Sequence, residues 1–193
     1  MCRFWTYDIF YHAAIRLGSY DYLMRMDDDS YFSNVVREDL FLYMKKQKLD
    51  YLYRSSYEEP YKAMQPILQR FLKNTKLSHG CIYNNMFVIR LKWYYESKRV
   101  QSFVHELIRD NLMLREYIGD GCVHSAMLEI DNRVKVERLT SISYGHNFHV
   151  MPPGYVKILF HFVKAFDEEM KKSCQQLTVL RDPQGILKRI KMS

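Results

Sequence analysis

Apolar and polar positions along this chain change between helical spacing and short strand-like runs. Aromatic and aliphatic residues recur at helical spacing over residues 4–17, and Gly18 and Ser19 follow as a stop signal. The mixed aromatic, apolar and basic residues of 20–26 are typical of a strand that approaches a core. Residues 36–48 again show an apolar helical side. The start of the chain therefore predicts a helix packed on a sheet, then a strand and a second helix.

Strand and helix patterns continue to alternate after this point. We expect strands at 49–53, 80–90, near Val134 and at 141–144, helices at 63–73, 103–116 and 123–130, and a polar loop at 54–60. Such alternation argues for an α/β architecture. With 193 residues, 48% of them hydrophobic and 15% aromatic, the chain has enough material for one well-packed core and too little for two.

Pro152, Pro153 and Gly154 interrupt the pattern near the C-terminus. We predict one domain over residues 1–150, followed at 151–193 by an amphipathic helix and a basic tail that pack on the same domain. No stretch reaches the roughly 18 uninterrupted apolar residues of a membrane helix, and charged residues interrupt any signal-peptide core at the N-terminus. We therefore expect no membrane span, and a chain complete as written would be cytoplasmic.

Charge and cysteine spacing narrow the class of partner. The net charge of +7 is concentrated in basic runs at 45–48, 171–172 and 188–191, and basic surfaces attract phosphates. These runs lack the patterns of an RNA-binding module or a zinc finger, so we expect no nucleic-acid partner. The cysteines are too widely spaced for a zinc ribbon or a Cys-x-x-Cys redox pair, and they leave the redox compartment open. They are Cys2, Cys81, Cys122 and Cys174.

Three consecutive carboxylates, Asp27, Asp28 and Asp29, follow the strand predicted at 20–26. Open α/β sheets bind ligands at the ends of strands. Alternate carboxylates of an Asp-x-Asp group can ligate a hard divalent cation, which can take further oxygens from a diphosphate. An acidic turn or a helix N-cap would explain the triplet equally well.

Several segments resemble, in the same order, motifs of the fungal glycolipid 2-α-mannosyltransferases, Golgi enzymes that move mannose from GDP-mannose to an acceptor mannose. Residues 1–4 resemble the Met-Cys-Arg-Phe helix of that family, and 22–32 resemble its strand ending in Arg-Val-Glu-Pro-Asp. Residues 119–125 match Trp-Gly-Asp-x-x-Val-His-Ser in five positions. Residues 142–146 fall on Ile-Gly-Tyr-x-His, whose histidine is a manganese ligand in the family.

The resemblance implies a GT-A-like nucleotide-diphospho-sugar transferase fold, with a mixed sheet flanked by helices. Residues 1–150 would be the catalytic domain, without part of the N-terminal nucleotide-binding half that precedes the Met-Cys-Arg-Phe helix in the family. The implied partners are a nucleotide sugar, GDP-mannose first, and a saccharide or glycoprotein acceptor. The implied compartment is the Golgi lumen. Membership in a neighbouring branch of GT-A glycosyltransferases is the alternative to this family. The sequence does not indicate an oligomeric state.

The same resemblance assigns the metal site. Asp29 and His146 are the first ligands expected, with Asp27 next and Asp28 facing sugar or ribose hydroxyls. A histidine among oxygen ligands favours Mn²⁺ over Mg²⁺. Neutralising a diphosphate leaving group is the largest electrostatic demand of such a transfer. Arg25 either pairs with the acidic residues or contacts a phosphate.

Asp120 is the candidate catalytic residue, because flanking glycines let the backbone approach a ligand and its carboxylate can orient or deprotonate the acceptor hydroxyl. It can equally be the N-cap of a helix that begins near Val123. Asn84 and Asn85 are candidates for binding sugar hydroxyls, or for a turn at a strand end. One departure from the family is Phe87, which we align with the glutamate proposed there as nucleophile.

Two further functions stay open on the sequence. A metal-dependent phosphoesterase or nuclease would also use carboxylates and a basic surface, but it usually needs ligands from several strands to hold two ions. The chain can also be an inactive or partner-dependent carbohydrate-binding remnant of a transferase, because the family's N-terminal portion has no counterpart in it.

Overall fold

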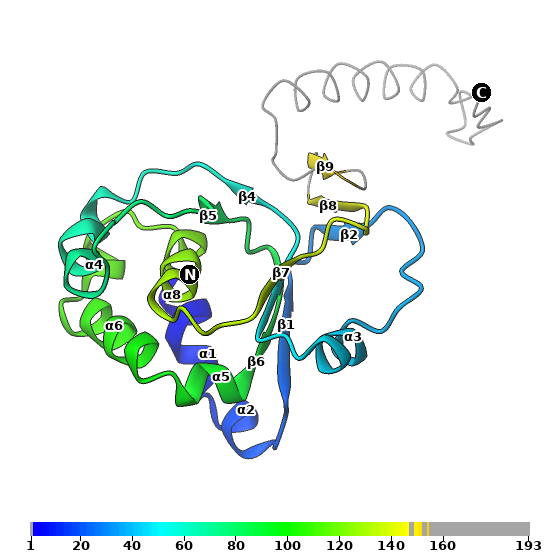
Figure 1. The fold of residues 1–193 in the computed structure, drawn as a ribbon, viewed down its shortest axis with the longest axis horizontal. Helices are drawn as coiled ribbons and strands as arrows, with labels where there is room; N and C mark the ends of the chain where they lie inside the picture. Colours follow the sequence, from blue (N-terminus) through cyan, green and yellow to red (C-terminus); the bar gives the residue numbers. More distant parts are fainter. Residues whose placement is uncertain (1, 147–148, 152–153, 155–193) are drawn as a thin grey trace, which may run out of the picture.

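A computed structural model describes residues 2–146, 149–151 and 154. Figure 1 shows a mixed sheet with most of the helices on one side and α3 on the other. The helical elements are η1 (Phe4–Asp8), α1 (Ile9–Tyr11), α2 (Ala13–Leu17), α3 (Leu40–Gln47), η2 (Lys62–Met64), α4 (Gln65–Phe71), α5 (Leu91–Glu96), α6 (Lys98–Arg109), α7 (Leu112–Arg115) and α8 (Asp120–Ile130). The strands are β1 (Tyr22–Met26), β2 (Ser30–Phe32), β3 (Tyr51–Tyr53), β4 (Ser56–Tyr57), β5 (Cys81–Ile82), β6 (Met86–Arg90), β7 (Val136–Arg138), β8 (Tyr144–His146) and β9 (His149–Met151).

The central sheet has the strand order β1-β6-β3-β7. β6 runs antiparallel to both β1 and β3, while β3 and β7 are parallel. β1 is the outer strand of this sheet, and within the described part of the chain no strand pairs with its other side. The predicted α/β class is confirmed, with a mixed sheet.

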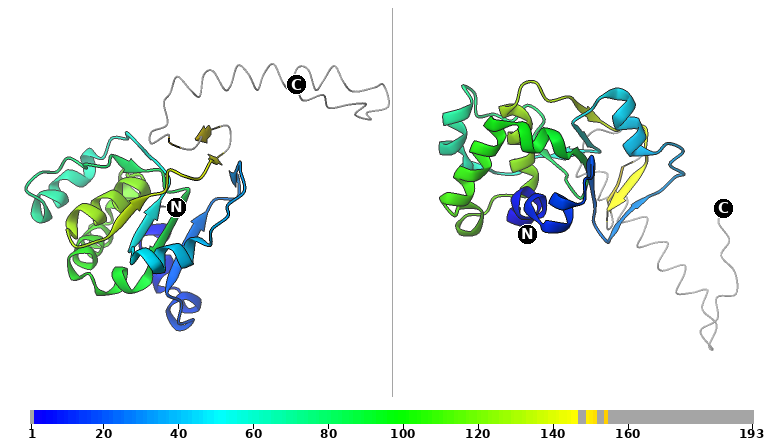
Figure 2. Two further views of the ribbon diagram at one scale, coloured as in Figure 1. Left: turned by 45° about the vertical axis from the view of Figure 1, so that its right-hand side comes forward. Right: turned by 90° about the horizontal axis from the view of Figure 1, so that it is seen from below.

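Side chains of the central strands alternate between two hydrophobic clusters, because successive residues of a strand point to opposite faces. In β6, Phe87 and Ile89 belong to the cluster beneath the large helical layer, whereas Met86 and Val88 belong to the cluster on the α3 side. The right-hand view in Figure 2 shows α3 on the opposite side of the sheet from the helical layer. The sheet is thus covered on both faces, which holds its strand ends in place.

A second sheet of order β2-β8-β9 lies beside the end of β1. Ser30 N–H donates to Asp27 O at 3.0 Å, so the chain turns sharply between β1 and β2. β2 then pairs antiparallel with β8, with Ser30 opposite His146. This pairing places the histidine next to the acidic turn, although the two segments are far apart in the sequence.

Element boundaries differ from the predictions where side chains cap a helix. α3 begins at Leu40 because the Asp39 carboxylate accepts from the backbone N–H groups of Phe41 and Leu42, at 2.8 and 3.1 Å. The helix predicted at 103–116 begins earlier, at Lys98, and is divided by Asn111, which has a φ of 53°. The predicted loop at 54–60 contains β4, which pairs with β5.

Most of the predicted C-terminal helix and tail, residues 151–193, lies outside the described residues, so its packing stays a prediction. Among the helices that are described, none has the length and apolar character needed to cross a bilayer.

Candidate functional site

The acidic triplet forms the turn between β1 and β2, as one of the two alternatives expected; no helix begins there, so the N-cap alternative is wrong. Its three carboxylates have different surroundings. Asp27 is partly buried and bonds back to Arg25, Asp29 is half exposed and faces His146, and Asp28 is exposed. Asp27 and Asp29, the alternate members of the group, therefore share one site.

His146 completes this site. Its Nε2 lies 3.0 Å from Asp29 Oδ1 and 3.9 Å from Asp27 Oδ2. The three residues bring their ligand atoms within 4.8 Å of one another. The other ring nitrogen, Nδ1, lies 2.6 Å from the hydroxyl of Tyr83. Tyr83 was not among the predicted site residues. Its only signal in the sequence was its place in the predicted strand at 80–90, directly before the two asparagines.

Without a cation, the Asn85 amide and the His146 ring cannot make favourable hydrogen bonds at all of their close contacts. Asn85 Nδ2 lies 2.5 Å from Asp27 Oδ2 and 2.8 Å from His146 Nε2, so the amide donates to both and Nε2 must accept. The lone pair of Nε2 then also faces the Asp29 carboxylate. If the Asn85 amide were rotated, its oxygen would lie against the Asp27 carboxylate oxygen. If Nε2 carried a proton, that proton would point at the amide hydrogens of Asn85. A metal cation between His146, Asp27 and Asp29 would relieve the repulsion between the Nε2 lone pair and the Asp29 carboxylate, and Asn85 would then donate to Asp27 alone.

The donor set suits a divalent cation of borderline hardness. Two carboxylate oxygens and one imidazole nitrogen are ligands that Mn²⁺ accepts. Adjacent ligand atoms around an octahedral ion with bonds of about 2.1 Å lie about 3 Å apart, which is the spacing between His146 Nε2 and Asp29 Oδ1. Bound metal would require Nδ1–H to donate to Tyr83, a typical outer-shell contact. The residues present therefore fit the ion that the resemblance implies.

Arg25 connects the acidic turn to the first residue of α8. Its Nε donates to Asp27 at 2.7 Å and its Nη1 to Asp120 at 2.8 Å, while its guanidinium lies 4.5 Å from the ring centre of Trp5. Burial alone would lower the pKa of Arg25, but the hydrogen bonds and charges of the two aspartates outweigh it and raise that pKa above its ordinary value. The side chain is 4% exposed, which favours the structural alternative over phosphate contact.

Asp120 is the first residue of α8, and Gly119 is the N-cap. The helix therefore begins three residues earlier than expected, and the N-cap alternative for Asp120 is wrong. Its Oδ1 accepts from the N–H of Gly121 at 3.1 Å, and part of the carboxylate remains exposed. The ion pair with Arg25 thus holds Asp120 at the same end of the sheet as the metal-ligand cluster.

The two asparagines have different places. Asn85 belongs to the cluster described above, whereas Asn84 is buried and its Nδ2 has no hydrogen-bond partner among the described residues. Phe87 is fully buried, stacked on Tyr51 with ring centres 5.6 Å apart. As expected from its chemistry, it is a core residue and supplies no nucleophile.

His124 is a fully buried histidine of α8, four residues after Asp120. Its Nε2 lies 3.1 Å from Trp5 O and its Nδ1 2.6 Å from the hydroxyl of Tyr51. Nε2–H therefore donates to the carbonyl, and Nδ1 accepts from the tyrosine. Burial lowers the pKa of His124 from 6.5 to about 4, so the ring is neutral in the folded protein.

We expect stability to fall as pH falls from about 6.5 towards 4, because the unfolded chain binds a proton at this histidine that the folded chain refuses. The neutral His124 contributes on the order of 3 kcal/mol to the free energy of unfolding. This contribution is fully present above the unfolded pKa and is lost progressively as pH falls to the folded pKa. Urea unfolding at pH 7 and pH 4.5 measures it. His124→Gln should show a clearly smaller loss than the parent chain, whereas the exposed control His105→Gln should not; equal losses in all three would contradict the assignment.

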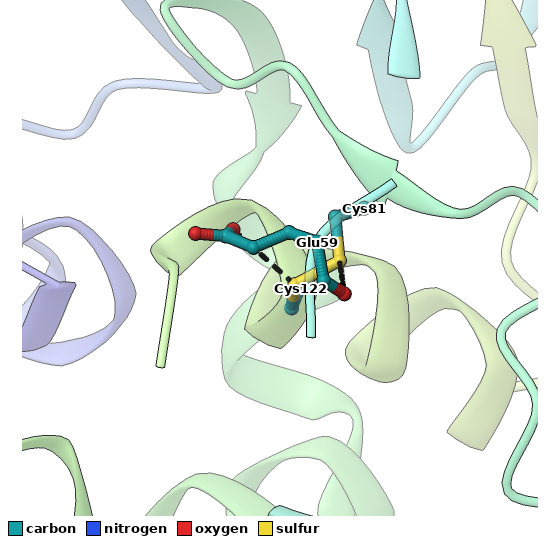
Figure 3. A group of neighbouring side chains, drawn as sticks. All are labelled: Glu59, Cys81 and Cys122. Carbon is teal, nitrogen blue, oxygen red and sulfur yellow. Dashed lines mark hydrogen bonds between the residues drawn. A yellow bond between two sulfur atoms is a disulfide. The ribbon is translucent and has the colours of Figure 1, made fainter. Parts of the chain in front are cut away.

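Glu59, Cys81 and Cys122 form a second group near Asp120 (Figure 3). The two cysteines, one on β5 and one in the first turn of α8, form a disulfide with a Cα–Cα distance of 4.2 Å. Both are buried, and Cys122 Sγ lies 3.5 Å from Glu59 Oε2. The hydroxyl of Tyr57 donates to Glu59 at 2.6 Å. Spacing in the sequence did not indicate this pair, since the two cysteines are 41 residues apart.

Of three comparisons with known proteins, one finds matches to this chain. No protein-family model matches the chain, and no curated protein sequence matches it. Solved structures do match. Core-mannan synthase A from Aspergillus fumigatus, in its Mn/GDP form, is 21% identical with a TM-score of 0.68, over 80% of this chain and 49% of its own.

The mannosyltransferase Ktr4p from S. cerevisiae matches in a structure with GDP, at 16% identity and a TM-score of 0.65, over 79% of this chain and 46% of its own. A second Ktr4p structure matches at 17% identity and a TM-score of 0.66, over 79% and 47%. The chain thus spans about half the length of these relatives. At this level of identity the likeness concerns the fold: over its described part the chain has a GT-A-like fold similar to half of these fungal mannosyltransferases.

Proposed function

We propose that this chain is the metal-binding part of a glycosyltransferase that moves mannose from GDP-mannose to a saccharide or glycoprotein acceptor with the help of Mn²⁺. The observation that carries the proposal is the convergence of Asp27, Asp29 and His146 at the end of β1. The fold and the manganese and GDP named for one structural relative support the choice of metal and nucleotide.

In this proposal each residue has a distinct task. Asp29, Asp27 and His146 would hold the cation, whose charge would stabilise the diphosphate leaving group. Tyr83 and Asn85 orient the imidazole and one carboxylate, and Arg25 keeps Asp27 and Asp120 at fixed positions. Asp28, exposed on the turn, is available to sugar or ribose hydroxyls.

Asp120 is the residue that we place beside the acceptor hydroxyl. It serves as base if transfer inverts the anomeric configuration. If transfer retains the configuration, the buried Phe87 offers no nucleophile, and a front-face route through a short-lived oxocarbenium ion is the one that we propose. Asn84, whose Nδ2 has no hydrogen-bond partner within the described part of the chain, is the proposed donor to a sugar hydroxyl.

The disulfide bears on the compartment. Disulfides persist in oxidising compartments and are rare in the cytosol. The bond between Cys81 and Cys122 therefore supports the Golgi lumen over the cytoplasmic alternative.

Calorimetric titration with GDP tests the proposal. We expect saturable binding in the presence of Mn²⁺ and none with EDTA. GMP, which lacks the second phosphate, should show no gain from the metal, because the ion is expected to bridge the diphosphate and the carboxylates. Binding that is indifferent to Mn²⁺ would contradict the metal site.

A second function, a partner-dependent carbohydrate-binding module, has one observation in its favour. β1 leaves one side of the sheet without a partner strand in the described part of the chain, and the chain spans about half of its structural relatives. Failure of the intact chain to bind GDP even with Mn²⁺ would favour this function. The phosphoesterase alternative is weaker, because a single aspartate and histidine cluster occurs among the described residues and two-ion chemistry needs more ligands.

A further inference from the structure

A cavity of about 1070 Å³ lies behind Glu59, between the β4–β5 pair, the end of α8 and β7. We propose that this cavity binds the saccharide acceptor, an inference that rests on the proposed transferase function. Its volume reaches the upper end of the range usual for ligand sites, roughly 300–1,000 Å³, and suits more than one sugar ring.

Aromatic rings line the cavity. Tyr57 and Tyr61 are its partly exposed rings, and the buried Tyr53 lies behind them in the wall. Arg138 holds Tyr53 in place, with its Nε 3.2 Å from the phenol oxygen and its guanidinium 5.2 Å from the ring centre. A pyranose ring has an apolar C–H face and a polar edge, so it can lie against the rings of Tyr57 and Tyr61 while its hydroxyls reach polar groups.

The polar groups of the cavity carry both signs of charge. Glu58 and Glu59 line it from one segment, Lys76 and Arg138 line it from two others, and Asn132 adds an amide. A site built for phosphate would concentrate positive charge. A mixture of carboxylates, cations and an amide instead offers hydrogen-bond donors and acceptors to a neutral polyhydroxyl ligand. This lining favours a saccharide over the nucleotide.

Glu59 joins the cavity to the candidate catalytic residue. It lines the cavity, and its carboxylate lies so close to Gly119 that a Cβ on that glycine would fall 2.1 Å from Oε2. Gly119 directly precedes Asp120. The disulfide holds β5 against the first turn of α8 at this point, as Figure 3 shows. In this proposal the end of the saccharide that accepts the sugar lies at the Glu59 side of the cavity, towards Asp120, and the chain extends towards β7.

Calorimetric titration of the full chain with α-linked mannotriose, without donor or metal, tests the inference. The variant is Asn132→Trp, which adds a large side chain at an exposed position of the wall. The matched control is Lys92→Trp, which adds the same side chain at an exposed position of α5 outside the cavity. We expect Asn132→Trp to weaken mannotriose binding by at least about tenfold and Lys92→Trp to change it by less than about twofold.

GDP titration with Mn²⁺ on the same proteins separates this inference from the proposed function. We expect Asn132→Trp to bind GDP as the parent chain does, which also shows that it folds. If the parent chain binds GDP but not mannotriose, or if Asn132→Trp still binds mannotriose normally, the cavity is not the acceptor site and the proposed function stands. Loss of both GDP and mannotriose binding in the parent chain would overturn both.

Discussion

Asp29→Ala is expected to weaken manganese-dependent GDP binding by more than about 100-fold, because loss of even an outer-shell partner of a metal site costs about 10- to 100-fold. Asp29 is the more exposed of the two aspartate ligands, and among the described residues His146 is its ion-pair partner, so removal should leave the rest of the turn in place. Asp27 is less suitable for this test, since it also bonds Arg25 and Asn85.

The control for this experiment is Asp21→Ala, which removes an exposed carboxylate just before the same strand. It should bind GDP and Mn²⁺ as the parent chain does. Thermal unfolding without metal should give closely similar midpoints for the parent and both variants, since Asp29 has few contacts. If Asp29→Ala binds GDP with the same dependence on Mn²⁺ as the parent, the acidic turn has no part in metal binding.

Removing the disulfide by the double substitution Cys81→Ser and Cys122→Ser is expected to lower the free energy of unfolding by about 4 kcal/mol. The bond closes a loop of 41 residues, and the loop-closure estimate for that length gives this value. Both sulfur atoms are buried, so two hydroxyls in their place would add an unfavourable burial of polar groups. Equilibrium unfolding in urea measures the change.

Two comparisons make this result specific. Cys2→Ser, at the free cysteine, should have a small effect, and a reductant should destabilise the parent chain and Cys2→Ser but not the double variant. If reductant leaves the parent chain unchanged, the two cysteines are not joined in solution. That outcome would also remove the support that the disulfide lends to an oxidising compartment.

Elements with a clear local pattern were predictable. The strand before the acidic turn and the helices near residues 4–17 and 63–73 follow from periodicity and apolar character, which act over a few residues. Errors occurred where one side chain decides a boundary. Asp39 caps α3, and Asn111 in a left-handed conformation divides α6 from α7.

The candidate site was only partly predictable. The triplet, Arg25 and Asp120 were recognisable as unusual charges, and the motif resemblance added His146. Tyr83 and Glu59 were missed, because a tyrosine or a glutamate in a polar segment has no local signal of what it will contact. Their roles depend on which strands become neighbours.

The sequence by itself determined the alternation of strands and helices, the place of the acidic turn at the end of a strand, and the chemistry of its carboxylates. Only the tertiary structure decided that Asp29 meets His146, that Arg25 joins Asp27 to Asp120, and that Cys81 meets Cys122. The physical reason is the range of the interactions. Periodicity and capping act within a turn or a strand, whereas these contacts depend on the register of β2 on β8 and on the packing of α8 against β5.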